Sequence, residues 1–146
     1  MTLDQVEKRL AILRKEEGVT FKELGKHGLK RETVIRIHEG KDYNISSLFR
    51  YLDALMYVIE INGILCADIE TFGNILHMGR QSSGLSLVQI QSKLVWTARQ
   101  VYAIEKGRGY SRSSLVKYTD VIKANYDLVS VFDLSSEIRE ALFKNI

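Results

Sequence analysis

An internal repeat limits the folds open to this chain more than any other feature of its sequence. Residues 37–55 align without a gap with residues 104–122, and residues 14–18 align with residues 80–84, one residue out of that register. The residues of the first stretch that recur at equivalent positions of the second are Ile37, Gly40, Tyr43, Ser46, Ser47, Leu48, Tyr51 and Asp53. A repeat of this length indicates two related modules. We expect them at residues 1–66 and 67–134, followed by a C-terminal helix within residues 135–146.

Each copy carries start and stop signals for four helices. Ser or Thr followed three residues later by Glu or Gln lets a side chain and the backbone cap each other. Such pairs are Thr2–Gln5, Thr20–Glu23, Ser86–Gln89 and Thr97–Gln100. We expect first helices at 3–17 and 69–82, ended by Gly18 and Gly84 in a left-handed cap. Two short helices follow in each copy, and then a longer helix at about 46–56 or 113–125.

Each copy ends in a run of residues typical of a β-strand, at 57–61 and at 128–132. Unpaired strand edges seek partners, either within the chain or across a homodimer. We expect the two runs to pair with each other and to hold the modules together.

Composition excludes several classes of protein. The content of 45% hydrophobic and 27% charged residues is typical of a globular protein, and no apolar run approaches the roughly 18 residues of a membrane span. Cys66 is the only cysteine and lies in an apolar stretch, so we expect a buried thiol and a cytoplasmic protein without membrane partner. His27, His38 and His77 lack metal-ligand spacing and an obvious carboxylate or Cys partner. With no Gly-rich phosphate loop after a strand, we expect neither an enzyme nor a cofactor.

The second copy resembles a known family over G-L-S-L-V-Q-I-Q-S-K-L-V-W-T-A-R-Q-V-Y-A-I-E-K-G, residues 84–107. Gly-Leu-Ser at its start and Ile-Glu-x-Gly at its end are similar to the Cro/phage-repressor, or XRE, type of helix-turn-helix domain. Gln91 replaces the usual Ala, and Val95 stands at the turn glycine. The first copy matches with one deletion and keeps Gly28 and Leu29 at its turn. The resemblance implies a mainly α fold of two tandem four-helix lambda-repressor-like DNA-binding domains, each followed by a short β-strand.

The resemblance also implies which side chains contact DNA. The recognition helices would be residues 30–39, with Val34 and Ile37 facing inward, and residues 97–106, with Val101 and Ile104 facing inward. The implied DNA contacts are Lys30, Arg31, Glu32, Arg36, Lys41, Tyr43, Ser86, Thr97, Ala98, Arg99, Tyr102, Arg108 and Tyr110. Arginine is the usual bidentate reader of guanine, while contacts from helix N-termini and from the turns would hold phosphates. Trp96 is expected in the core.

Family members often clamp the recognition helix with a buried ion pair, which the resemblance assigns to Arg80 and Glu105. The first copy has Arg14, but His38 occupies the position of the glutamate and Glu39 follows it. We expect Glu39 or a water molecule to compensate, or else Arg14 to point into solvent.

Charge is unevenly distributed along the chain. Residues 80–123 hold eight basic and two acidic residues, either an electrostatic footprint for phosphates or an ordinary solvated surface. We predict sequence-specific binding of double-stranded DNA and transcriptional regulation, with the two modules acting as a covalent pseudo-dimer on a non-palindromic site. The alternative is a protein-interaction module or antitoxin-like regulator in which only one module binds DNA, as a homodimer or with a protein partner. The acidic residues Glu32, Glu39 and Asp42 weaken the first module as a DNA reader.

Overall fold

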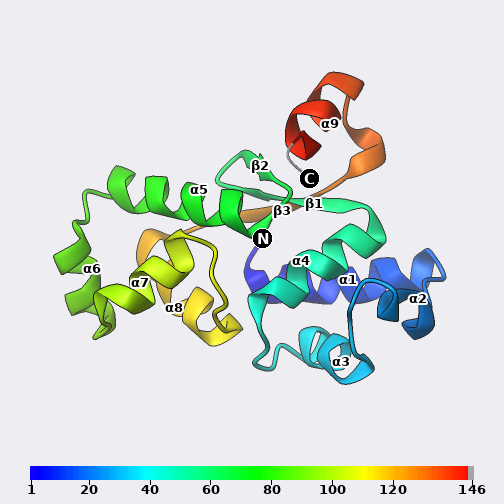
Figure 1. Cartoon of the computed structure of the whole chain (residues 1–146), viewed down its shortest axis with the longest axis horizontal. Coiled ribbons are helices and arrows are strands. Elements are labelled where there is room, and N and C mark those ends of the chain that lie inside the picture. The colour runs from blue at the N-terminus through cyan, green and yellow to red at the C-terminus, as the bar shows by residue number, and fades with distance from the viewer. Residues whose placement is uncertain (145–146) are drawn as a thin grey trace.

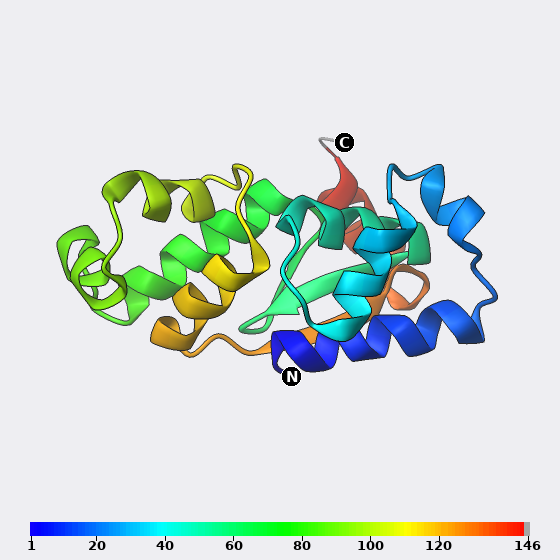
Figure 2. The same cartoon turned by 90° about the horizontal axis from the view of Figure 1, so that it is seen from below.

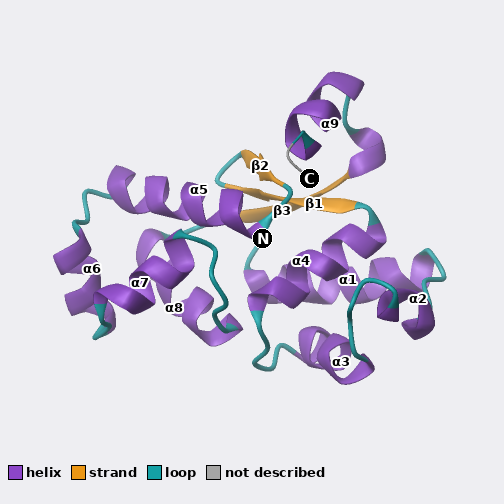
Figure 3. Ribbon diagram, in the orientation of Figure 1, coloured by secondary structure: helices purple, strands orange, loops and turns teal. Residues whose placement is uncertain are grey.

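The computed structural model describes residues 1–144, which form a mainly helical molecule with a small antiparallel sheet. The elements of the first copy are α1 (Leu3–Glu16), α2 (Phe21–Gly25), α3 (Arg31–Glu39), α4 (Ile45–Leu55), β1 (Tyr57–Ile61) and β2 (Ile64–Cys66). Those that follow are α5 (Ile69–Ser82), α6 (Leu87–Leu94), α7 (Ala98–Glu105), α8 (Arg112–Ile122), β3 (Tyr126–Ser130), a turn of 3-10 helix at Val131–Asp133, and α9 (Ser136–Phe143). Helices α1–α4 and α5–α8 form two groups on either side of the sheet (Figures 1 and 3).

The predicted caps start the helices at the expected residues. Thr2, Ser86 and Thr97 each form a reciprocal capping box with the Gln three residues later. Thr20 accepts a hydrogen bond from the backbone of Glu23, without a bond in return. Gly18 and Gly84 follow α1 and α5 with φ of +66° and +72°, the left-handed conformation that glycine adopts without strain. Local sequence signals therefore define the helix ends.

The strands pair as expected and join the two halves of the chain. The sheet has the order β2-β1-β3, and β1 runs antiparallel to β3, with Tyr57 opposite Ser130 and Ile61 opposite Tyr126. Strand β3 begins two residues before the predicted run at 128–132, whose last two residues belong to the 3-10 turn. Strand β2 was not predicted, although Asn62–Gly63, both at positive φ, is a strong hairpin signal.

The main core is continuous across both helix groups. The ring of Phe49 on α4 lies 5.3 Å from that of Phe72 on α5, and Phe72 lies 6.3 Å from Tyr126 on β3. Trp96 packs against this core, partly buried, and Cys66 is fully buried, which raises the pKa of its thiol to about 12. The backbone N–H of Tyr126 donates to the carbonyl of Met1, so the start of α1 lies beside β3 (Figure 2).

A second, smaller apolar cluster lies where α9 meets the sheet. Val58, Ala67, Val131 and Leu134 form it, and Leu142 and Phe143 of α9 pack against it. Within residues 1–144, no helix is long and apolar enough to cross a membrane.

Candidate nucleic-acid interface

Helices α3 and α7 are the predicted recognition helices, called the reading helices below for that prediction, and each is anchored by one apolar face. Val34 and Ile37 of α3, and Val101 and Ile104 of α7, are fully buried. Helix α3 packs on α1, and α7 packs on α5 and α6. The spacing of three residues puts both anchors of a helix on one face. The opposite face of each helix is therefore left for solvent or a partner.

Most of the predicted DNA contacts lie on these outer faces or beside them. Exposed residues of the first copy are Lys30, Arg31, Glu32, Arg36 and Lys41. Exposed residues of the second copy are Ser86, Thr97, Arg99, Tyr102 and Arg108, while Ala98 is half-buried. The structure thus places these side chains in two surface groups, one along each reading helix.

A groove follows the outer face of α7. It has a volume of about 760 Å³ and is lined by Ala98, Arg99, Tyr102, Ala103, Lys106, Arg108 and Gly109. Three of these residues are cationic and none is acidic. An anionic ligand would meet attractive charge along its length.

Two predicted contacts lie elsewhere. Tyr43 and Tyr110 lie on the turns after the reading helices, as expected, but each is only 7% exposed, which leaves little of either side chain for a contact with DNA. The hydroxyl of Tyr43 donates a hydrogen bond of 2.6 Å to Oε2 of Glu7. Burial raises the pKa of the Tyr110 hydroxyl, and its ring is part of the main core. Both tyrosines hold the turns in place from the inside.

The predicted ion pair of the second copy is present. Nε and Nη2 of Arg80 donate to Oε2 and Oε1 of Glu105, at 2.7 and 3.1 Å, and the Tyr118 hydroxyl also donates to Oε2. Nη1 of Arg80 donates to the carbonyl of Leu85, so the pair joins α5, α7 and the start of α6. Burial raises the pKa of Glu105, but hydrogen bonds from Arg80, Tyr118 and His77 outweigh it and lower the pKa.

The expectation that His77 lacks a carboxylate partner was wrong, because its Nδ1 lies 2.7 Å from Oε1 of Glu105. The contact joins residues on α5 and α7, so sequence spacing did not reveal it.

The first copy has replaced this ion pair. Nε2 of His38 lies 2.6 Å from the hydroxyl of Tyr51, which stands where Tyr118 stands in the second copy. Glu39 does not compensate for the lost carboxylate, since it pairs with Lys41 at the surface, at 2.8 Å. Burial and the nearby cations Arg14 and Lys15 lower the pKa of His38, which favours the neutral form of its imidazole.

Arg14 does not point freely into solvent either. Its Nη1 donates to the carbonyl of Val19, as Arg80 does to Leu85, and its guanidinium lies 4.6 Å above the ring of Phe21. The guanidinium of Arg31 lies 5.1 Å from the same ring. A cation over an aromatic face is attracted to it. Phe21 thus contacts both Arg14 and Arg31.

The turns at residues 40–44 and 107–111, called the junction below, meet each other after the two reading helices. Asn44 and Ser111 form an antiparallel bridge. The N–H of Ile45 donates to the carbonyl of Tyr110 at 2.9 Å, and the N–H of Arg112 donates to the carbonyl of Tyr43 at 2.8 Å. Ile45 is equivalent to Arg112 in the repeat, and Tyr43 is equivalent to Tyr110. The two hydrogen bonds are therefore related to each other by the repeat.

The same symmetry governs the sheet. Glu60 of β1 lies directly opposite Asp127 of β3, and the two residues are equivalent in the repeat, as Asn44 and Ser111 are. These two contacts between the copies are thus centred on pairs of equivalent residues. This is the arrangement of an isologous two-fold interface, made here within one chain.

Side chains that break this symmetry reinforce the junction. Glu7 on α1 is fully buried and accepts bonds of 2.7 and 2.8 Å from Nε and Nη2 of Arg112 on α8. Asp42 accepts bonds from the backbone N–H and the hydroxyl of Ser113, at 2.9 and 3.2 Å. Neither contact was predicted from the sequence. The signal for Glu7 was its place among Leu3, Val6 and Leu10 on the apolar stripe of α1.

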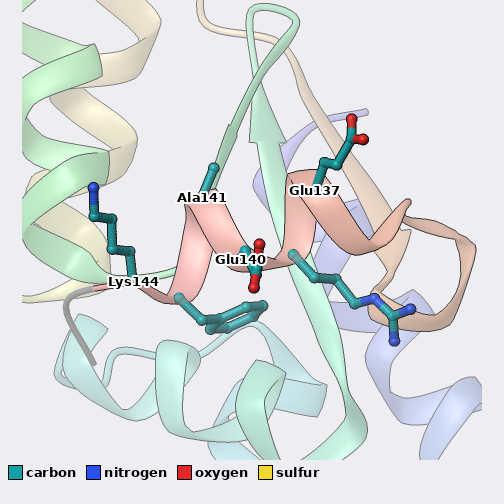
Figure 4. Close-up of a pocket in the computed structure, with 6 residues that line it drawn as sticks. Glu137, Glu140, Ala141 and Lys144 are labelled. Atoms are coloured by element: carbon teal, nitrogen blue, oxygen red, sulfur yellow. The ribbon is translucent and has the colours of Figure 1, made fainter.

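A second hollow lies on α9 and has a different character. It has a volume of about 880 Å³ and is lined by Glu137, Arg139, Glu140, Ala141, Phe143 and Lys144 (Figure 4). Its residues all come from one helix and carry charges of both signs. It lies apart from α3 and α7 (Figure 1), so it is not part of the candidate interface.

No family model, curated protein or solved structure matches the chain.

Proposed function

We propose that this protein is a sequence-specific regulator that binds double-stranded DNA with two helix-turn-helix modules of the lambda-repressor type, joined as a covalent pseudo-dimer. The observation that carries the proposal is the pairing of equivalent residues at two places, Asn44 with Ser111 and Glu60 with Asp127. Dimeric helix-turn-helix proteins bind two half-sites related by the two-fold axis of the protein. This chain has such an axis between its own halves.

The chemistry of the outer faces supports the same proposal. Arg31, Arg36 and Arg99 are exposed along the reading helices, and arginine contacts guanine O6 and N7 in a bidentate manner. Lys30, Lys106 and Arg108 add positive charge at the ends of these helices, where phosphate contacts would position the protein on the duplex. A major groove about 12 Å wide admits one such helix.

Asp42 and Glu39 oppose DNA binding less than their charges imply. The Asp42 carboxylate bonds to Ser113, and Glu39 pairs with Lys41. Of the three acidic residues near the first reading helix, Glu32 alone keeps a carboxylate for which no partner is found among residues 1–144. A carboxylate in the major groove accepts a bond from cytosine N4, so Glu32 fits a role in base reading.

The proposed site is not palindromic. The outer face of α3 offers Arg31, Glu32 and Arg36, while that of α7 offers Ala98, Arg99 and Tyr102. Different side chains prefer different base edges. Each module would therefore read its own half-site.

Selection of bound sequences from random DNA tests the proposal. Wild type, Arg36→Ala and Arg99→Ala would be compared at low and moderate salt, with Arg9→Ala, an exposed arginine on α1, as the matched control. We expect a bipartite motif in which Arg36→Ala relaxes one half and Arg99→Ala the other. Each loss should be about 1–3 kcal/mol of discrimination. Absence of binding at low salt, where phosphate contacts are strongest, would end the proposal.

Exposed apolar side chains favour a protein partner as the second candidate function. Ile12 of α1 is 48% exposed and Met56, which follows α4, is 44% exposed, and both lie in the first module. Exposed apolar surface is where protein partners commonly bind. If Arg99→Ala alone alters the selected motif, the first module serves such a partner and only the second reads DNA.

A further inference from the structure

We infer that Glu7 and Arg112 are a positioning pair that fixes the second reading helix relative to the first, so that the protein accepts only one spacing between its half-sites. This inference rests on the proposed function for its consequence at DNA. The pair itself is a property of the protein alone.

Besides the core that they share, the two helix groups are attached at two separate places. Strands β1 and β3 join them at the sheet, and the junction joins them after the reading helices (Figure 1). Without the junction, the reading-helix ends of the two groups would be held only through the sheet and the shared core, and would be freer to move relative to each other. The junction removes that freedom, but its backbone contributes only the two hydrogen bonds made by Ile45 and Arg112.

The side chain of Arg112 extends from the junction into the interior of the first module. It lies at the start of α8 and reaches Glu7 on α1, which also accepts the hydroxyl of Tyr43. A Cβ atom at Gly40, which ends α3, would lie 3.5 Å from Nη2 of Arg112. The guanidinium is therefore packed against the end of the first reading helix while its backbone belongs to the second module.

Because both side chains are largely buried, the ion pair of Glu7 and Arg112 is either fully formed or fully broken. Glu7 is fully buried, and the side chain of Arg112 is only 16% exposed. Opening the junction would leave a carboxylate without its partner in an apolar interior, a state that proteins avoid strongly. Intermediate openings are disfavoured because the two-pronged geometry tolerates little displacement.

The pair is made once among residues 1–144, unlike the symmetric contacts around it. Gly73 and Ile45 stand at the positions equivalent to Glu7 and Arg112, and neither is charged. A Cβ atom at Gly73 would lie 2.6 Å from the carbonyl oxygen of Ile104, so this position is filled by close backbone packing instead. The asymmetric pair is thus an addition to the two-fold arrangement.

A rigid junction has a direct consequence for DNA. Each base pair inserted between half-sites moves one of them by about 3.4 Å and rotates it by about 34°. A hinged protein would follow part of that movement, whereas a locked one must lose contacts. Wild type should therefore show a sharp optimum in spacing.

A distance measurement tests the lock without DNA. Spin labels would be placed at Lys26→Cys and Ser92→Cys, exposed and equivalent positions beside α2 and on α6. Buried Cys66 stays unlabelled. Glu7→Gln removes the charge, Arg112→Lys keeps the charge but loses the two-pronged geometry, and Lys8→Gln is the exposed control. We expect broader distance distributions for the two pair variants and an unchanged one for Lys8→Gln. Unchanged distributions in folded pair variants would overturn the inference, whatever the protein binds.

A spacing series tests the consequence. Half-sites from the selected motif would be separated by one base pair more or fewer than the optimum. Wild type should lose about tenfold in affinity, the worth of one good base contact, and Arg112→Lys about threefold or less. Identical spacing profiles in a protein that does bind DNA would refute the lock. If wild type binds no DNA, the proposed function fails, and the distance measurement still decides whether the lock exists.

Discussion

Position 105 and its equivalent, position 38, show how one residue changes a module. Glu105 binds Arg80, Tyr118 and His77 at the end of the second reading helix. His38 keeps only the contact to the tyrosine, Tyr51, and Arg14 turns to Phe21. A carboxylate accepts several bonds at once, whereas a neutral imidazole has one donor and one acceptor nitrogen. The first reading helix is therefore held by weaker and fewer polar contacts.

Removing the carboxylate of the second copy should destabilise the protein markedly. In Glu105→Gln the guanidinium of Arg80 stays buried without its counter-charge, which costs about 3–5 kcal/mol. Urea unfolding would measure the change in the free energy of unfolding. Glu39→Gln breaks only the surface pair with Lys41 and should cost less than about 1 kcal/mol. Equal losses in the two variants would contradict the role of the buried pair.

Histidine 38 should make stability depend on pH. Its pKa is lowered in the folded state by burial and by Arg14 and Lys15, so the unfolded chain binds the proton more readily. Its contribution is present above the ordinary histidine pKa of about 6.5 and is lost as the pH falls through the lowered pKa. Unfolding of wild type and His38→Gln at pH 7.5 and 5.5 should show a smaller loss in the variant. Exposed His27→Gln is the control, and a variant with the full wild-type loss would refute this account.

At the scale of elements, the turns between the short helices place different residues at the same left-handed position. Gly28 provides the positive φ in the first copy, while Val95 adopts φ of +56° at the end of α6. A β-branched residue in this conformation is strained. Val95 is 89% exposed, so packing of its side chain does little to offset this backbone strain.

Val95→Gly should therefore stabilise the protein. Relief of the left-handed strain is worth about 1–2 kcal/mol, of which the greater freedom of glycine in the unfolded chain offsets a part. We expect a net gain of about 1 kcal/mol in urea unfolding. Val88→Gly makes the same substitution inside α6, where glycine costs about 0.5–1 kcal/mol. A destabilised Val95→Gly would show that the turn is not strained.

At the scale of the whole molecule, the two modules share a core. Phe49 of the first packs on Phe72 of the second, and Tyr126 on β3 completes the contact. Stability is thus not divided between two independent units. Small domains with one core unfold in a single cooperative transition, and we expect the same here.

Damage to one module should lower the stability of the other. Phe49→Ala leaves a cavity beside Phe72 and should cost about 3–5 kcal/mol. Fluorescence of Trp96, which lies in the second module, and far-UV circular dichroism should then shift together to lower denaturant concentration. Ile12→Ala, at a half-exposed position of α1, is the control and should shift both little. Two separate transitions, with Trp96 unaffected by Phe49→Ala, would refute a shared core.

Much of the secondary structure of this protein could be predicted from local signals in its sequence. The resemblance implied the ion pair of Arg80 and Glu105, while capping pairs, glycines and apolar periodicity placed the helices within a few residues. Helix caps and apolar periodicity depend on interactions between residues that are close together in the chain. A short stretch of sequence is therefore enough to recognise them. The exposed side chains of the reading helices followed from the same periodicity.

The contacts between the halves were decided only by the tertiary structure. Glu7 and Arg112 are separated by 105 residues, and Tyr43 and Tyr110 are buried because the turns that carry them meet. Burial turns an ordinary surface charge into one that requires a specific partner, and nothing local to Glu7 identifies that partner. The sequence alone showed that the chain has two related halves. Packing in three dimensions decided how they are joined and which of their polar residues form the contacts between them.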